Sequence, residues 1–168
     1  MDVDVDVDSL PPERPMPPTD FQPADPAYAE RVRESFARQA AMGTIGAELV
    51  RVEAGEVEVQ LAWAAHLTQQ HGFLHGGILG AALDSACGYA ASTLMPADVG
   101  VLSIEYKINF VAPARGQRFR LVGTVVKPGR TISVVEGRAY AVEGDREKLV
   151  ATMSATMMTV AGRDDVKS

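Results

Sequence analysis

Cysteine and long apolar runs are scarce in this chain of 168 residues, and each scarcity excludes a class of protein. The one cysteine, Cys87, cannot build a disulfide framework or a zinc site of several cysteines, and it fits a reducing compartment. No run of about 18 uncharged apolar residues exists, so no membrane span is expected. The first residues alternate Asp and Val, which is not the pattern of a secretory signal. We therefore expect a soluble, cytoplasmic protein with no membrane partner.

Acidic residues and prolines are concentrated near the N-terminus. Residues 1–26 hold seven acids against Arg14 alone, and seven of the ten prolines of the chain. A segment with so little apolar content cannot bury enough surface to offset the entropy lost on ordering. The sequence predicts a disordered acidic tail over 1–26, one domain over 27–162 and a flexible tail over 163–168. The first tail is expected to be a solubilising leader, with an interaction arm as the alternative.

Basic residues gather in a second segment. From Val101 to Arg138 the chain has seven bases and only Glu105 and Glu136 as acids, an imbalance that suits an anionic ligand. The bases are Lys107, Arg115, Arg118, Arg120, Lys127, Arg130 and Arg138. The segment lacks the aromatic pattern used to stack on nucleobases, and the domain as a whole is not basic. No nucleic-acid partner is therefore expected.

The apolar pattern predicts an α+β domain. The expected elements are a helix over 27–42, strands over 47–53 and 56–63, a helix over 76–94, and strands over roughly 99–111, 117–127, 131–143 and 147–160. The second helix is apolar on nearly all sides, so it has to be buried. An antiparallel sheet wrapped around that helix buries both. The short turns predict that the last four strands are antiparallel neighbours, which excludes a doubly wound parallel sheet.

A His-Gly-Gly motif, His75-Gly76-Gly77, stands at the entrance of the expected buried helix. Paired glycines let the backbone approach another group closely, and the N–H groups of a first helical turn have no partner within the helix. Together with the helix dipole, these groups can bind an anion or a developing oxyanion. Close packing alone is the alternative explanation of the glycines.

Asp84 is the one carboxylate in a helix otherwise built of apolar or small residues. Burying a lone carboxylate is costly, so it should have a partner, face a cavity or have a raised pKa. It lies on nearly the same helix face as Gly76 and Gly77, about 10–12 Å further along, so a ligand lying along the helix could contact both. An ordinary surface Asp is the alternative, which the apolar neighbours Leu83 and Cys87 disfavour.

Other chemistries fit these segments less well. A zinc site of His66, His71 and His75 would lack an acidic or cysteine ligand in the same loop. Ser85 or Cys87 as a nucleophile would need a nearby histidine base, and Cys87 is expected to be inert packing. We expect neither a metal nor another cofactor.

Three segments together resemble the hot-dog-fold acyl-CoA thioesterases of the phenylacetate-pathway (PaaI-like) group. They are TQQHGFLHGGILGAALDSACGYAAS, LSIEYKINFVAPARG and VVKPGRT, in the same order as in that group. The resemblance spans about 41–160 and implies a central helix wrapped by an antiparallel sheet. It also implies a homodimer or a homotetramer (a dimer of dimers) with active sites at the subunit interface. The implied activity is hydrolysis of an acyl-coenzyme A thioester to a free acid and coenzyme A.

The same resemblance implies roles for individual residues. The Gly76 N–H would polarise the thioester carbonyl, with Gly77 beside it in contact with the substrate. Asp84 would act as general base or nucleophile from the partner subunit, and His75 would orient the site. Ser103 falls where several members place a polar residue that helps to position the attacking water.

One position departs from that group. Many members have an Asn six residues before the His of the His-Gly-Gly motif, where it binds the thioester or the water. Here Gln69 stands at that position and is followed by Gln70. A glutamine offers the same amide on a longer stem, so either residue could take over the role.

The phosphates of coenzyme A fit the basic segment. The tight turn that contains Lys127, Gly129 and Arg130 is the first choice for binding them, and Arg115 and Arg118 come next. The alternative is that these bases are solvated strand ends.

Two other functions stay open at this point. A hot-dog hydratase or dehydratase would use an Asp/His or His/Glu pair, and neither local motif is found in the sequence. A non-catalytic acyl-coenzyme A binder or sensor would use the same pocket without turnover. Small residues along the buried helix leave room for an acyl chain or serve dimer packing.

Overall fold

Residues 21–166, which the computed structural model describes, form three α-helices, six β-strands and two 3-10 helices. In chain order these are α1 (Tyr28–Ala37), α2 (Ala40–Ile45), β1 (Ala47–Glu53), β2 (Glu56–Ala62), η2 (Ala65–Leu67), α3 (Gly76–Ser92), β3 (Gly100–Phe110), β4 (Arg118–Lys127), β5 (Ile132–Glu143), β6 (Arg146–Val160) and η3 (Asp164–Val166). No helix in this part of the chain is long and apolar enough to cross a membrane.

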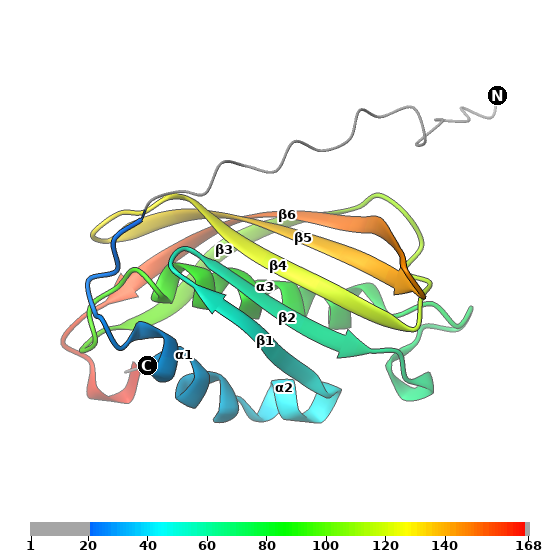
Figure 1. Ribbon diagram of the computed structural model, residues 1–168, viewed down its shortest axis with the longest axis horizontal. Helices are drawn as coiled ribbons and strands as arrows, with labels where there is room; N and C mark the ends of the chain where they lie inside the picture. Colours follow the sequence, from blue (N-terminus) through cyan, green and yellow to red (C-terminus); the bar gives the residue numbers. More distant parts are fainter. Residues whose placement is uncertain (1–20, 167–168) are drawn as a thin grey trace.

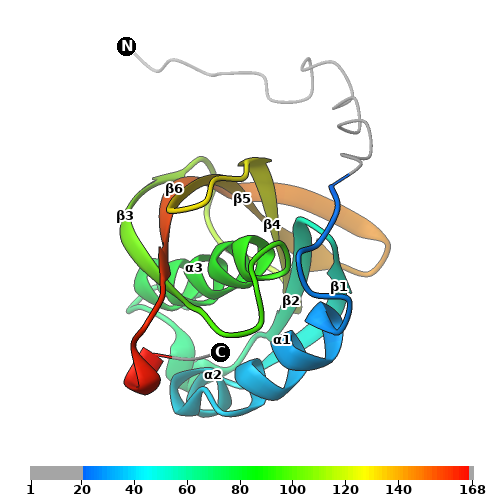
Figure 2. The ribbon, with the colours of Figure 1, turned by 90° about the vertical axis from the view of Figure 1, so that its left-hand side faces the viewer.

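All six strands belong to one antiparallel sheet that curves around α3 (Figure 1, Figure 2). Their order is β1-β2-β4-β5-β6-β3, so β1 and β3 are the edges. The expected α+β fold with a sheet wrapped around one helix is confirmed. The expectation that the last four strands are antiparallel neighbours is confirmed for β4, β5 and β6 and was wrong for β3, which pairs with β6 and not with β4.

The chain just before β4 explains this order. Trp63 N–H, at the end of β2, donates to the Gln117 carbonyl (2.9 Å), and Gln117 N–H donates to the Val142 carbonyl of β5 (3.0 Å). These two bonds begin β4 between β2 and β5. The pairing of β4 with β2 on one side and with β5 on the other continues along the strand, and hydrophobic spacing does not encode it.

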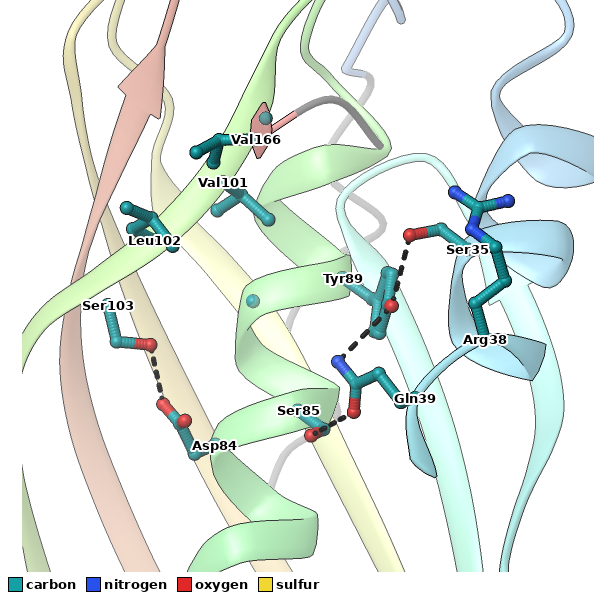
Figure 3. A pocket seen from close by; sticks show the side chains of 12 residues that line it. Ser35, Arg38, Gln39, Asp84, Ser85, Tyr89, Val101, Leu102, Ser103 and Val166 are labelled. Carbon is teal, nitrogen blue, oxygen red and sulfur yellow. Dashed lines mark hydrogen bonds between the residues drawn. The ribbon is translucent and has the colours of Figure 1, made fainter. Parts of the chain in front are cut away.

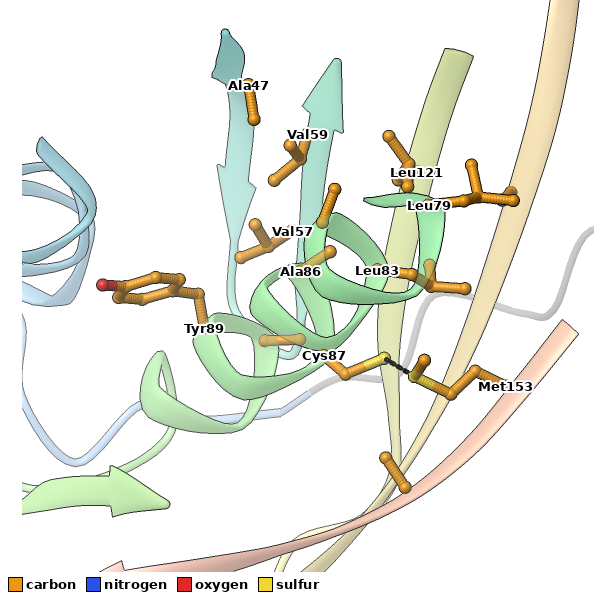
Figure 4. Packing of buried hydrophobic residues seen from close by; sticks show 14 of the residues in the cluster. Ala47, Val57, Val59, Leu79, Leu83, Ala86, Cys87, Tyr89, Leu121 and Met153 are labelled. Atoms are coloured by element: carbon orange, nitrogen blue, oxygen red, sulfur yellow. Dashed lines mark hydrogen bonds between the residues drawn. The ribbon is translucent and has the colours of Figure 1, made fainter. Parts of the chain in front are cut away.

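Helix α3 packs closely on the sheet because two paired glycines leave room for it. A Cβ at Gly123 of β4 would lie 2.5 Å from the Ala86 backbone, and a Cβ at Gly137 of β5 would lie 2.8 Å from the Cys87 Sγ. Cys87 is fully buried with its Sγ 4.0 Å from the Met153 Sδ (Figure 4). Burial, and less strongly the nearby Asp84 charge, raise the pKa of the Cys87 thiol, so it acts as inert packing as expected.

The single helix expected over 27–42 is broken into α1 and α2. The break falls at Arg38 and Gln39, where Gln39 has an extended backbone (φ −73°, ψ 97°). The Gln39 side chain turns onto α3, where its Nε2 donates to the Tyr89 hydroxyl (3.2 Å) and its Oε1 accepts from the Ser85 hydroxyl (3.2 Å). The break thus anchors the first helices to α3 through polar contacts.

Residues 21–26, which we expected to belong to the N-terminal tail, contact the domain. The Phe21 ring lies against the Gly55 turn. Asp25 accepts from Ala27 N–H and pairs with Arg31 (2.9 Å each), and Arg31 in turn donates to the Ser92 carbonyl (3.0 Å). The remainder of the expected tail, residues 1–20, lies outside the described residues. At the other end, the described part of the expected 163–168 tail includes η3.

Candidate active site

The His-Gly-Gly motif forms the first turn of α3. Leu74 N–H donates to the Ala114 carbonyl (3.0 Å) and His75 N–H donates to the Leu67 carbonyl (2.9 Å), which fixes the loop that enters the helix. His75 is the N-cap, and its Nδ1 accepts from Gly77 N–H (2.9 Å). Among the described residues, Gly76 N–H has no hydrogen-bond acceptor. This group is therefore a donor available to a ligand at the positive end of the helix dipole.

Phe110, at the end of β3, packs closely against Gly76. A Cβ at Gly76 would lie 2.8 Å from the Phe110 Cζ, although the Phe110 side chain is itself half exposed. Close packing and an available N–H thus occur together at Gly76, so the two explanations of the motif are not exclusive.

Asp84 lies on the middle of α3 and faces β3. Its carboxylate is half buried and accepts a hydrogen bond from the Ser103 hydroxyl (2.8 Å). Burial raises the pKa of Asp84, and the Ser103 hydrogen bond opposes this by stabilising the ionised form. The lone carboxylate therefore has a partner and a raised pKa.

Asp84 also faces a cavity of about 380 Å³ (Figure 3). The cavity lies over the uncovered face of α3, between the start of β3 and the junction of α1 with α2. It is lined by Ser35, Arg38, Gln39, Asp84, Ser85, Gly88, Tyr89, Gly100, Val101, Leu102, Ser103 and Val166. Asp84 and Ser103 are the two expected site residues that this cavity brings together.

The two candidate amides lie in the loop that precedes α3. The Gln69 Oε1 accepts from His71 N–H, and the Gln70 Nε2 is 3.3 Å from the His71 Nε2. Gln69 N–H also donates to the Phe73 carbonyl (2.9 Å), which closes a tight turn. Neither amide contacts Asp84 in this chain, and Gln69 is the more buried of the two.

The expected phosphate-binding residues form the turn between β4 and β5. Gly129 N–H donates to the buried Ser133 hydroxyl (3.2 Å), and a Cβ at Gly129 would lie 2.0 Å from the Ile132 carbonyl oxygen, so the turn requires glycine. Gly129 and Arg130 line a second cavity of about 420 Å³ near the C-terminal end of α3. This turn is therefore separated from Gly76 by the length of the helix.

The bases between Val101 and Arg138 include one that is ion-paired within the described fold and others that are not. Arg120 pairs with Glu147 (2.7 Å) and Glu58 (3.5 Å), so its charge is already neutralised within the fold. Lys127 and Arg130 are exposed and form no ion pair with any residue that the structure describes. Their charges are therefore available to an anion.

Several residues of the cavity beside Asp84 were missed by the sequence analysis. Ser35 lies on α1, and Gln39 stands at the break between α1 and α2, which no local signal indicates. Gly88, by contrast, is one of the small residues of the buried helix that were expected to leave room for an acyl chain or to serve dimer packing. A Cβ at Gly88 would meet nothing within 4 Å, so this glycine opens the helix surface to the cavity.

Comparisons with known proteins give the family. A model described as the thioesterase superfamily matches residues 71–148. The crystal structure of a thioesterase family protein from Silicibacter pomeroyi is 50% identical, covers 80% of this chain and 99% of its own, and superimposes with a TM-score of 0.79. The chain belongs to the thioesterase superfamily. The general reaction of this protein is therefore hydrolysis of a thioester.

Two other proteins extend the comparison. The 1,4-dihydroxy-2-naphthoyl-CoA hydrolase of Listeria monocytogenes is 27% identical over 114 residues, which cover 68% of this chain and 90% of that protein. The PaaI protein of E. coli is 18% identical, with a TM-score of 0.72 over 80% of this chain and 94% of its own. The hot-dog thioesterase fold of the PaaI-like kind is confirmed.

Proposed function

We propose that this thioesterase hydrolyses an acyl-coenzyme A thioester to a free acid and coenzyme A. The observation that carries the proposal is the half-buried Asp84 carboxylate, which faces a cavity on α3 and is held by Ser103. The second reacting group is the Gly76 N–H, which has no acceptor in the described chain. A buried base and a preorganised N–H donor are what acyl transfer to water needs.

Asp84 opens the thioester by one of two routes. As a general base it takes a proton from water while the water oxygen attacks the carbonyl carbon. As a nucleophile it attacks that carbon itself, and water then hydrolyses the resulting anhydride. In both routes the carbonyl oxygen becomes an oxyanion that Gly76 N–H stabilises, and the C–S bond breaks as the oxyanion collapses. In the general-base route Asp84 returns its proton to the leaving sulfur, whereas in the nucleophilic route coenzyme A leaves as the thiolate and takes a proton from water.

Two copies of the chain are needed to bring these groups together. Gly76 and Asp84 are eight residues apart on one straight helix, about 12 Å along its axis, so one carbonyl cannot contact both. The edge strand β3 is unpaired on one side and carries exposed apolar side chains, which favours pairing with a second copy. These side chains are Leu102, Ile104, Tyr106 and Phe110. We propose a homodimer in which Asp84 faces Gly76 of the partner subunit.

The coenzyme A assignment rests on the β4–β5 turn. Arg130 is exposed and lines a cavity, and Lys127 is exposed three residues before it, so both charges are available to phosphates. The Listeria relative is named as the hydrolase of a coenzyme A thioester, which supports the same class of substrate.

Removing Arg130 tests this assignment. Because Arg130 would contact the nucleotide part of the substrate, Arg130→Ala should raise KM for an acyl-coenzyme A about tenfold and leave kcat nearly unchanged. The same acyl group on pantetheine, which lacks the nucleotide, should be hydrolysed equally well by both proteins. Thiol release measured with a thiol-reactive dye gives KM and kcat for both proteins on both substrates.

Arg33, exposed on α1, provides the matched control, and Arg33→Ala should change neither KM. An unchanged KM in Arg130→Ala removes Arg130 from the site. Stabilisation of the wild type by acyl-coenzyme A without thiol release would contradict the proposed function and favour a binding protein.

The pH dependence of hydrolysis should report on Ser103. The reaction needs ionised Asp84, so kcat/KM should fall as the pH drops through the raised pKa of that carboxyl. Ser103→Ala removes the bond that favours the ionised form, so the pKa of Asp84 rises further and the acid limb moves to higher pH. Ser103→Thr, which keeps a hydroxyl, should restore most of the wild-type profile. Coincident acid limbs in all three proteins would contradict the pairing of Ser103 with Asp84.

A further inference from the structure

The cavity beside Asp84 has two walls of different chemistry (Figure 3). One wall is formed by Val101, Leu102 and Val166 and is apolar. The opposite wall carries polar side chains from α1, from the α1–α2 junction and from α3. They are Ser35, Arg38, Gln39, Ser85 and the hydroxyl end of Tyr89.

The polar wall is a fixed network. The Ser85 hydroxyl donates to the Gln39 Oε1 and the Gln39 Nε2 donates to the Tyr89 hydroxyl oxygen, each over 3.2 Å. The Tyr89 hydroxyl lies 3.2 Å from the Ser35 hydroxyl. Either hydroxyl of the Tyr89–Ser35 pair can donate, and where Tyr89 donates to Ser35 the Ser35 O–H is free to donate to a ligand.

Arg38 adds a positive charge to the same wall. It is exposed at the C-terminal end of α1, and it forms no ion pair or side-chain hydrogen bond with any residue that the structure describes. The Arg38 guanidinium on this side of the cavity therefore has N–H donors without an acceptor among the described residues. A ligand that satisfies them must bring an oxygen that accepts hydrogen bonds.

Gly88 sets the floor between the two walls. A Cβ at this position would meet nothing within 4 Å and would point into the cavity that Gly88 lines. The open floor leads from Asp84 to the polar wall, so an acyl chain whose carbonyl is at Asp84 can extend over Gly88 along the apolar wall.

We propose that the cavity binds the acyl part of the substrate and selects acyl groups with a hydrogen-bond-accepting oxygen, a hydroxyl or a carboxylate, at the end remote from the thioester. Ser35 and Arg38 are the specificity-determining residues, and Gln39 positions Ser35 through Tyr89. The inference rests on the proposed function, because it takes Asp84 as the site of thioester attack.

The test compares coenzyme A esters of equal length with a methyl, a hydroxyl or a carboxylate at the far end, for chains of four, six and eight carbons. The wild type should show a kcat/KM about tenfold higher for an oxygenated ester than for the plain ester of at least one length. Arg38→Leu should reduce the preference for the carboxylate, and Ser35→Ala should reduce the preference for both oxygenated esters. The control Arg33→Leu, on the same helix and exposed, should leave every ratio as in the wild type.

Equal hydrolysis of plain and oxygenated esters at all three lengths would overturn the inference while the proposed function stands. The inference would also be overturned if the Ser35→Ala/Arg38→Leu double variant kept the wild-type ratio of kcat/KM for the oxygenated ester to kcat/KM for the plain ester. Hydrolysis of none of the esters would remove the proposed function and this inference with it.

Discussion

Asp84→Ala should lower kcat for thioester hydrolysis by about 10³-fold, because it removes the group that activates water or attacks the carbonyl carbon. The fold should remain intact. Burial raises the pKa of Asp84, so the ionised carboxylate is less stable in the folded than in the unfolded protein. Above that raised pKa, replacing the carboxylate removes a penalty, and the melting temperature should not fall. Thiol release and thermal unfolding on the same samples measure both effects.

Two further variants test whether the loss is due to the Asp84 carboxylate itself. Asp84→Asn keeps the shape and a hydrogen bond to Ser103 but cannot act as a base, so it should be as inactive as Asp84→Ala. Asp98→Ala removes an exposed carboxylate in the loop after α3 and should retain wild-type turnover. Substantial hydrolysis by Asp84→Asn would contradict the catalytic role of Asp84.

Gly76→Pro should lower kcat by about 10²–10³-fold, the usual cost of losing one oxyanion donor. Proline has no N–H, and Gly76 is the first residue of α3, a position at which proline is well tolerated. The preceding His75 has the extended backbone that a following proline favours (φ −64°, ψ 132°). The substitution therefore removes the donor with little disturbance of the helix.

Gly76→Ala provides the matched control, because it adds a Cβ at the same place but keeps the N–H. Both variants require the half-exposed Phe110 ring to move, so any loss due to Phe110 appears in both. Single-turnover hydrolysis should be much slower in Gly76→Pro than in Gly76→Ala. Equal rates in the two variants would show that the Gly76 N–H does not stabilise the reaction.

Much of the fold was accessible from the sequence because hydrophobic periodicity reports burial. The apolar α3 and all six strands were predicted close to their observed bounds. Strand order was not accessible in full, since β4 pairs along its length with β2 and β5 and not with β3, which precedes it in the chain. The break at Gln39 was missed for the same reason, because its polar partners lie far away in the chain.

The candidate site was likewise predictable only where the signal lies in the local sequence. Asp84 and the His-Gly-Gly motif were singled out locally, as a carboxylate among apolar residues and as paired glycines at a helix entrance. The polar wall of Ser35 and Gln39 could not be found in this way, since it exists only after α1 and α2 pack on α3.

Mixed dimers test the central claim that each active site combines Asp84 of one subunit with Gly76 of the other. Asp84→Ala and Gly76→Pro chains, coexpressed with different affinity tags and purified as the heterodimer, should recover about half of the wild-type activity because one of the two sites is intact. A heterodimer of the wild type with the Asp84→Ala/Gly76→Pro double variant should be nearly inactive. The opposite pair of results, an inactive first heterodimer and a half-active second one, would mean that each subunit carries its own complete site and would contradict the account.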